Sequence, residues 1–244
     1  MTGKNGNRLY SEVRGKGLFI KKAAEVGVFY PQTSNIADFI EDGIPCLLVE
    51  PDPVSLEKIG AAFGNRKNVT VYPLAIADAN GRLELVQKGA STFARNLPRS
   101  PTLVNDGYTP KAEDVFSVEA VTFDRIDPGD IDLLSLDIEG GEWFAIRHMK
   151  SRPKVISVET HGNRYRNFYL KEIDAWMRNN GYRQWYKDES DTVYSRRRSA
   201  DVTIREKLAL EMVSAGILIR RIRGTIRQKL AMRRNCQMIP HAER

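Results

Sequence analysis

The chain has 244 residues, of which 41% are hydrophobic and 28% charged, and a formal net charge of +7. No apolar run reaches the roughly 18 residues that a membrane-spanning helix needs, and the polar first ten residues lack the apolar core of a secretory signal. The two cysteines, Cys46 and Cys236, form neither a disulfide framework nor a CxxC metal pair. We therefore expect a cytoplasmic protein.

The positive charge is concentrated near the C-terminus. Residues 212–241 carry seven basic residues and no acidic one, which accounts for the whole net charge and leaves the main body balanced. Aromatic residues are absent from Ile204 onward, so this segment offers no platform for base stacking. A nucleic-acid partner is therefore disfavoured.

In chain order, residues 1–17 predict a polar N-terminal arm, and the following residues alternate between strands and helices. The first half predicts a strand at 18–24, a helix at 34–43 that starts at Ser34 as N-cap and stops at Gly43, an apolar strand at 45–51, a helix at 52–64, a strand at 68–78 and an edge strand at 80–87 after a hairpin turn. Residues 89–116 have no clear period and read as a long loop, in which Phe93 and Tyr108 are candidates for stacking on a sugar ring.

The second half repeats the alternation. It predicts strands at 116–126, 131–137 and 153–161, helices at 142–149 and 169–180, and a closing antiparallel pair at 182–187 and 191–197. Alternating strands and helices indicate an α/β fold with a doubly wound, mainly parallel sheet over residues 18–198.

Acidic residues follow several of the predicted strands. The apolar run LLSL ends in Asp137, Glu139 and Glu142, with Gly140 and Gly141 allowing a tight turn. In open α/β sheets ligands bind at this carboxyl end of the strands. We therefore expect a binding crevice here, although Glu139 and Glu142 could equally be a solvated first helical turn.

The ends of the first two strands indicate a nucleoside without a pyrophosphate. The first strand is followed by the single glycine Gly27 rather than by a GxGxxG phosphate cradle, which disfavours a dinucleotide. Glu50, at the end of the second strand, is placed to accept hydrogen bonds from ribose hydroxyls. The alternative is that Glu50 only caps the next helix.

These segments, in the order EVG, VEPDP, LAIADANG, DIEGGEW and VETH, resemble the FkbM family of S-adenosylmethionine-dependent methyltransferases over residues 18–195. The resemblance implies a class I, Rossmann-like methyltransferase fold and S-adenosylmethionine as cofactor. It implies that the cofactor is bound by the residues at the strand ends: Glu25 and Gly27 beside the methionine part, Glu50 and Pro51 at the ribose, Asp78 near the adenine, and Asp137.

The chain departs from the family pattern at two places. Val28, Phe29 and Tyr30 are bulky where the family has small or polar residues, and Ser135 stands where a lysine is common. The acceptor implied by the resemblance is a hydroxyl, of a sugar in a glycan, a glycolipid or a glycosylated metabolite.

For catalysis, Asp137 and His161 are the candidates for the base and its orienting partner, with Glu139 beside them. Alternatively, the cluster of Asp137, Glu139, Glu142, Glu159 and His161 holds a divalent cation that lowers the pKa of the hydroxyl, with Asp137, Glu159 and His161 as the first candidates. His161 could also be only a structural histidine at a strand end. The rival functions are a non-catalytic nucleoside- or glycan-binding module and a metal-dependent hydrolase.

Residues 199–244 predict a basic amphipathic helical tail. One apolar stripe recurs at steps of three and four, at Leu208, Met212, Ala215, Ile219, Ile222, Ile226 and Leu230. Such a helix can dock on its own domain, join two copies of the chain or lie on an anionic membrane. Our prediction is the last of these, a cytoplasmic enzyme held peripherally at the inner membrane.

Overall fold

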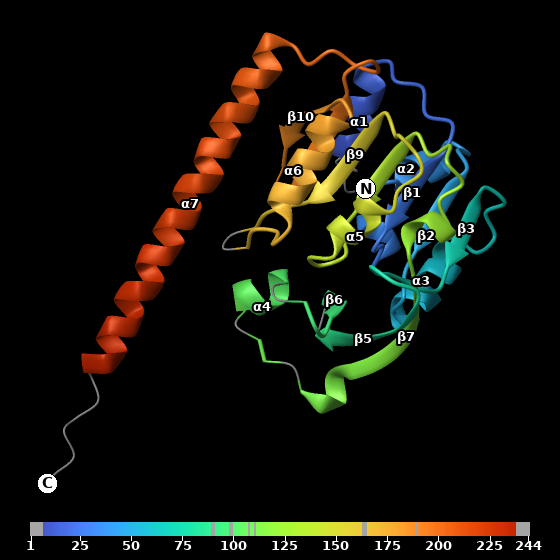
Figure 1. Ribbon diagram of the computed structural model, residues 1–244. Helices are drawn as coiled ribbons and strands as arrows, with labels where there is room; N and C mark the ends of the chain where they lie inside the picture. The colour runs from blue at the N-terminus through green and yellow to red at the C-terminus, as the bar shows by residue number, and fades with distance from the viewer. Residues whose placement is uncertain are drawn as a thin grey trace, which may run out of the picture.

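A computed structural model describes residues 7–88, 91–97, 100–106, 108–109, 111–162, 165–188 and 190–237, and for residues 91, 105, 106 and 225–237 it describes the backbone alone. Its central layer is a seven-stranded sheet in the order β10-β11-β9-β8-β1-β2-β3 (Figure 1). The strands are β1 (Ala23–Val26), β2 (Cys46–Val49), β3 (Val69–Tyr72), β8 (Leu133–Leu136), β9 (Val155–Glu159), β10 (Tyr182–Lys187) and β11 (Asp191–Arg196). Only β11 runs antiparallel to its neighbours, so the predicted mainly parallel sheet is confirmed.

The strands are short apolar runs because both faces of the sheet are covered. Every residue of β1, β8 and β9 is buried, as expected for parallel strands between two helical layers. One face packs on α1 (Arg8–Gly15), α2 (Ala37–Glu41) and α3 (Pro53–Phe63). The other face packs on α5 (Glu142–Arg147) and α6 (Leu170–Asn179). Alternate residues of each strand, such as Leu133 and Leu134, enter opposite cores.

A second, smaller sheet lies beside the carboxyl ends of the central strands. Its order is β4-β7-β5-β6, with β4 (Ala75–Ile76), β5 (Gly81–Lys88), β6 (Ser91–Ala94) and β7 (Val115–Val121). Two expectations were wrong here. The strand expected at 68–78 is divided near Pro73, which has no N–H for a ladder, and β5 pairs on both sides instead of forming an edge.

The predicted loop 89–116 is also wrong in part, because it contains β6 and α4 (Pro101–Asp106). Phe93 pairs with Val86 across the ladder and is buried, which its polar surroundings in the sequence did not indicate. Short 3-10 helices at Pro31–Thr33, Ala112–Asp114 and Phe123–Arg125 complete the connections.

Both ends of the chain are more closely attached to the domain than expected. Within the predicted polar arm, α1 inserts Leu9 and Val13 into the core, while residues 1–6 lie outside the described part. Ala200 and Val202, at the start of the predicted tail, pack against the same core before α7 (Ile204–Gln237) begins. The folded body therefore extends beyond the boundaries 18 and 198 on both sides.

The start of α2 also differs from the prediction. The helix begins after Ile36 without a side-chain cap, and the Ser34 hydroxyl instead donates to the carboxylate of Glu25 at 2.5 Å. Gly43 ends the helix as expected, with a φ of 77°. The serine is thus used to satisfy a buried carboxylate rather than a helix terminus.

Gly27 permits the closest backbone approach in this part of the fold. Its φ is 82°, and a Cβ at this position would lie 1.8 Å from the carbonyl oxygen of Asp137. The segment after β1 therefore passes directly over the end of β8, which brings the two segments together at the same point of the sheet. Only glycine combines this φ with this contact.

We predict that Gly27→Ala lowers the free energy of unfolding by about 3 kcal/mol or prevents folding, because a left-handed φ and a backbone overlap both oppose the new methyl group. Gly43→Ala is the matched control: its φ is 77°, but no atom lies within 4 Å of the added Cβ. It should cost only about 1 kcal/mol. Urea unfolding measures both, and equal losses would show that the approach to Asp137 is not the constraint.

Candidate functional site

The carboxyl ends of β1, β2 and β8 open into a cavity of about 800 Å³. It lies where β1 is flanked by β2 on one side and by β8 on the other, which is the topological switch point of the sheet. The small sheet and the residues after β6 form another wall through Arg82, Leu83, Leu85, Thr92, Ala94, Asn96, Leu97 and Ala120, and Phe144, Tyr169, Asp188 and Ser190 also line the cavity. Neither Phe93 nor Tyr108 lines the cavity, so neither predicted stacking residue is placed for that role.

Glu50, the predicted ribose ligand, is 4% exposed and holds the backbone of the segment after β1. Its Oε2 accepts from the backbone N–H groups of Val28 and Phe29 at 3.0 Å each, and its Oε1 accepts from that of Asp52 at 2.9 Å. Burial raises the pKa of this carboxyl, and the three hydrogen bonds oppose the shift. Because a carboxylate has about four acceptor positions, most of its capacity is already used.

The bulky segment after Gly27, residues 28–30, packs around Glu50. Val28 is buried in the core, and Phe29 adopts a φ of 48°, a conformation that is uncommon for a large side chain. The rings of Phe29 and Tyr30 lie 3.8 Å apart between centroids, and the Lys58 ammonium lies 3.8 Å from the centroid of the Tyr30 ring. Phe29 lines the cavity, so this departure from the family pattern shapes the binding surface.

Glu25 is held on the other side of the same segment. It is 2% exposed, and its carboxylate accepts from the Ser34 hydroxyl and from the Asn35 backbone N–H at 2.7 Å. Burial raises its pKa to about 7, against the effect of these two donors. The Asn35 side chain donates to the hydroxyl of Ser135, the residue that replaces the family's lysine. This serine is therefore part of the packing behind the cavity.

Pro51 and Asp78 line the cavity at its outer side. Asp78 follows β4 and is exposed, with its carboxylate 3.0 Å from both the Arg147 guanidinium and the His148 imidazole. The Arg147 guanidinium and the His148 imidazole thus hold the residue predicted to lie near the adenine.

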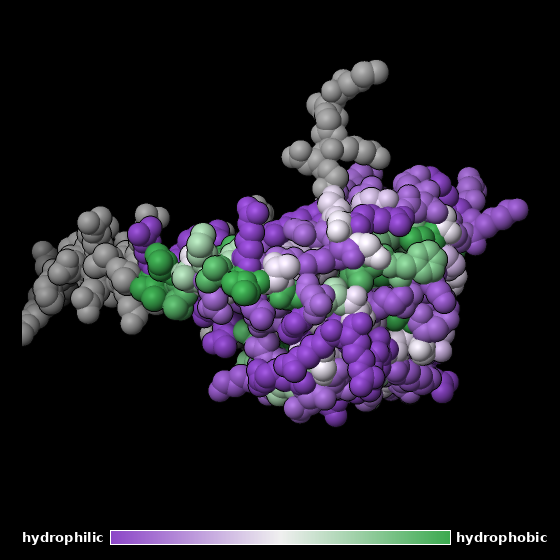
Figure 2. Space-filling model, turned by 90° about the horizontal axis from the view of Figure 1, so that it is seen from above, coloured by the Kyte–Doolittle hydropathy of each residue, from purple (hydrophilic) through white to green (hydrophobic). Residues whose placement is uncertain are grey.

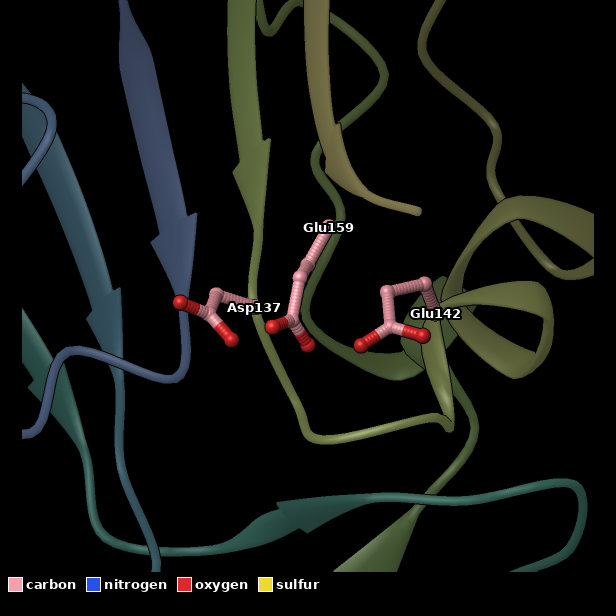
Figure 3. A group of neighbouring side chains, drawn as sticks. All are labelled: Asp137, Glu142 and Glu159. Atoms are coloured by element: carbon pink, nitrogen blue, oxygen red, sulfur yellow. The ribbon is translucent and has the colours of Figure 1, made fainter. Parts of the chain in front are cut away.

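Three carboxylates meet at the ends of β8 and β9 and the start of α5 (Figure 3). Asp137, Glu142 and Glu159 each place an oxygen within 4.8 Å of the others. Glu142 is fully buried, and its oxygens accept from the backbone N–H groups of Ile138 and Gly140 and from the Asn167 amide. Glu142 therefore closes the turn between β8 and α5, and burial raises its pKa to about 7.

The other two members of the group are less constrained. Among the described residues, no hydrogen-bond donor contacts Oε2 of the buried Glu159. Asp137 is half-buried and lines the cavity, and so does Glu139, whose φ is 56°. Burial and the surrounding carboxylates raise the pKa of Asp137 and of Glu159 well above their ordinary values. Asp137 is thus an unusually basic carboxylate with access to a bound ligand.

His161 is not part of this group. Its Nδ1 is 2.9 Å from the Thr160 hydroxyl, its Nε2 is 3.1 Å from the carbonyl oxygen of Asp188, and it does not line the cavity. Burial lowers its pKa. The predicted cation ligands Asp137, Glu159 and His161 are therefore not brought together as a set, because the side chain of His161 is held against the loop before β11. The third carboxylate beside Asp137 and Glu159 is instead that of Glu142.

Sequence reasoning missed Asp191, which the antiparallel strand β11 brings to the cavity. It is 5% exposed and accepts from the hydroxyls of Ser157 and Ser190. Burial and Asp188 raise its pKa to about 6. Nothing in the local spacing indicates this role, since Asp191 lies 54 positions after Asp137 and reaches the site only through strand pairing.

The buried carboxyl of Glu25 makes stability depend on pH. Because its pKa is about 7 in the folded chain and about 4.5 when unfolded, the folded state holds a proton that the unfolded state releases. The free energy of unfolding therefore falls as the pH rises from about 4.5 to about 7. Glu25→Gln removes this titration. The decrease in the free energy of unfolding between about pH 5 and about pH 8 should therefore be about 2 kcal/mol smaller in this variant than in the unchanged protein.

Urea unfolding at the two pH values measures the difference. Glu57→Gln, at an exposed position of α3, is the matched control and should lose as much stability as the unchanged protein. An equal loss in Glu25→Gln would show that this carboxyl does not carry the pH dependence.

Comparison with known proteins places this site in a family. The FkbM methyltransferase domain matches residues 24–184, about two thirds of the chain. No curated protein sequence matches the chain. Among solved structures, the methyltransferase domain of bacterial CtHen1-C is 12% identical, with a TM-score of 0.42 over 78% of this chain and 96% of that chain. Fibrillarin from Aeropyrum pernix, with natively bound S-adenosyl-L-methionine, is 11% identical, with a TM-score of 0.41 over 76% and 73%. By the domain match, the chain belongs to the FkbM methyltransferase family.

Proposed function

We propose that this methyltransferase transfers the methyl group of S-adenosylmethionine to a hydroxyl, and that the hydroxyl belongs to a sugar of a glycan, a glycolipid or a glycosylated metabolite. Methyl transfer follows from membership of the family. The observation that supports a hydroxyl acceptor is the basic carboxylate of Asp137, which lines the cavity at the end of β8.

The cavity suits S-adenosylmethionine by charge and by size. Its lining includes seven acidic residues, Glu25, Glu50, Asp78, Asp137, Glu139, Asp188 and Asp191, and one basic residue, Arg82. Such a surface favours a ligand that carries a sulfonium and an ammonium group and disfavours phosphorylated acceptors. A volume of about 800 Å³ is within the range of small-molecule sites and leaves space for part of an acceptor beside the cofactor.

The lining residues have separate tasks. Gly27, Glu25, Glu50 and Pro51 would surround the cofactor at the ends of β1 and β2, with Asp78 at the outer side. When bound, S-adenosylmethionine supplies an electrophilic methyl group. In its ionised form, Asp137 would accept the proton that the acceptor hydroxyl loses, and burial and the neighbouring carboxylates raise the affinity of this form for a proton. Glu142 positions Asp137 by holding the turn that follows it.

The small sheet is the natural acceptor surface. The sheet and the residues after β6 add Leu83, Leu85 and Leu97 to the cavity, together with the polar side chains of Arg82, Thr92 and Asn96. Sugars present both apolar C–H faces and hydroxyl groups, and this mixed lining offers contacts for each. The acidic lining favours a neutral sugar over a sugar acid.

We predict that Asp137→Asn binds S-adenosylmethionine within about threefold of the unchanged affinity but lowers methyl transfer by about 100-fold or more, because the amide cannot accept the proton. Calorimetry measures the first, and transfer of labelled methyl groups to extracted glycans measures the second. Asp130→Asn, at an exposed position before the amino end of β8, is the control and should leave both unchanged.

The same assay separates the alternatives. Binding of S-adenosylmethionine without transfer by the unchanged protein to any glycan pool would support a non-catalytic module. Loss of transfer on adding a chelator, with recovery on adding Mg²⁺, would assign Asp137, Glu142 and Glu159 to a divalent cation rather than Asp137 to proton transfer.

A further prediction concerns Glu50→Gln. The amide loses an acceptor for one of the two backbone segments that Glu50 joins, so the loop after β1 is released. We expect the affinity for S-adenosylmethionine to fall by about tenfold, because one well-made hydrogen bond to a carboxylate is worth about 1.5 kcal/mol. Calorimetry checks this result, with Glu57→Gln as the exposed control. Unchanged affinity would remove Glu50 from the cofactor site.

A further inference from the structure

The C-terminal helix α7 leaves the domain and extends beyond it (Figure 1). Its first turns are attached: they pack on β10, and Glu206 accepts from the Lys16 ammonium and from the Trp185 indole N–H at 2.8 and 2.9 Å. The Thr203 hydroxyl and the Glu206 carboxylate cap the helix reciprocally. The 34-residue helix is therefore fixed to the domain at its N-terminal end.

The apolar stripe of α7 faces away from the domain. Leu208 and Met212 are 62% and 74% exposed, and Ile219 and Ile222 are exposed as well. Ile217, half a turn from Leu208 around the helix axis, is 8% exposed. Figure 2 shows these hydrophobic residues gathered along the helix. The stripe described in the sequence is thus not the surface by which the helix docks on its own domain, and the side chains of Ile226 and Leu230 lie outside the described residues.

Basic residues accompany this stripe. Arg205, Arg220 and Arg223 are exposed, and residues 212–241 contain no acidic residue. Arg205 and Arg223 project about 60° from the centre of the stripe and form one border, while the exposed Glu211 lies about 60° away on the other side. An apolar strip with arginines along one border matches the interface of an anionic bilayer, where acyl chains lie below a layer of phosphates. No helix in the described part of the chain is long and apolar enough to cross a membrane.

We propose that α7 is a docking helix that lies in the surface of an anionic lipid bilayer, with Leu208, Met212 and Ile219 inserted and Arg220 and Arg223 at the phosphate layer. A second copy of the chain would also cover the stripe. However, two such helices would bring their acid-free basic segments close together, and the like charges would oppose pairing. Anionic lipid turns the same charges into an attraction.

The test is flotation of the full-length protein with vesicles of phosphatidylcholine containing about 30% phosphatidylglycerol, and with vesicles of phosphatidylcholine alone. The protein should float with the first and not with the second, and raising the salt from about 0.1 M to about 0.5 M should release it. The variant with Leu208→Gln, Met212→Gln and Ile219→Gln should bind at least about tenfold more weakly, because the substitutions remove the inserted area.

A second variant, with Arg220→Gln and Arg223→Gln, should bind about 30-fold more weakly. Its matched control replaces two exposed basic residues of the body, Lys67→Gln and Lys171→Gln, and should float like the unchanged protein. All variants should keep their affinity for S-adenosylmethionine, which shows that the domain is folded and that membrane docking stands apart from the proposed methyl transfer.

Several results would overturn the proposal. The protein could fail to float with anionic vesicles, or it could float equally with neutral ones. The body control could also lose as much vesicle binding as the variant with Arg220→Gln and Arg223→Gln. Sedimentation equilibrium tests the alternative that a second copy of the chain covers the stripe. If the protein ignores the vesicles and the stripe substitutions convert a dimer to a monomer, then the stripe is a contact between copies of this chain.

Discussion

Carboxylates that are crowded at the carboxyl ends of parallel strands have to be stabilised by hydrogen bonds, and the loops around the cavity are arranged to supply them. Glu50 receives three backbone N–H groups, Glu25 receives one with a serine hydroxyl, and Glu142 receives two with an amide. Each of these bonds also fixes a piece of loop. The acids therefore stabilise the loop structure of the site as well as shape its chemistry.

The same arrangement distinguishes two kinds of acid in the site. Glu25, Glu50 and Glu142 are buried and already hydrogen-bonded to the protein, so they act mainly as supports. Asp137 is half-buried and opens on the cavity, while burial and the neighbouring carboxylates raise its pKa. A basic carboxylate that is reachable by a ligand arises because the surrounding acids are held in place and cannot move away from it.

Charge separates the molecule into two functional parts. The cavity is acidic and suits a cationic cofactor, whereas the positive charge of the chain is placed on a helix that leaves the domain. Glu206, in the first turn of α7, joins this helix to the domain by accepting hydrogen bonds from Lys16 and Trp185. This arrangement keeps the basic segment away from the acidic cavity.

Local sequence determined the alternation of strands and helices, the strand-end acids, Gly27 and the family, because these depend on neighbouring residues and on fixed spacing. Local sequence did not reveal the strand β6, the burial of Leu9 and Val13 in the core, or the position of Asp191 at the cavity, since each depends on pairing or packing between distant segments. The periodicity of α7 likewise predicted an apolar stripe but not its direction. Only the tertiary structure decided that Ile217 faces inward and Leu208 outward, and that His161 is turned from the carboxylates it was expected to join, because such orientations are set by contacts across the fold.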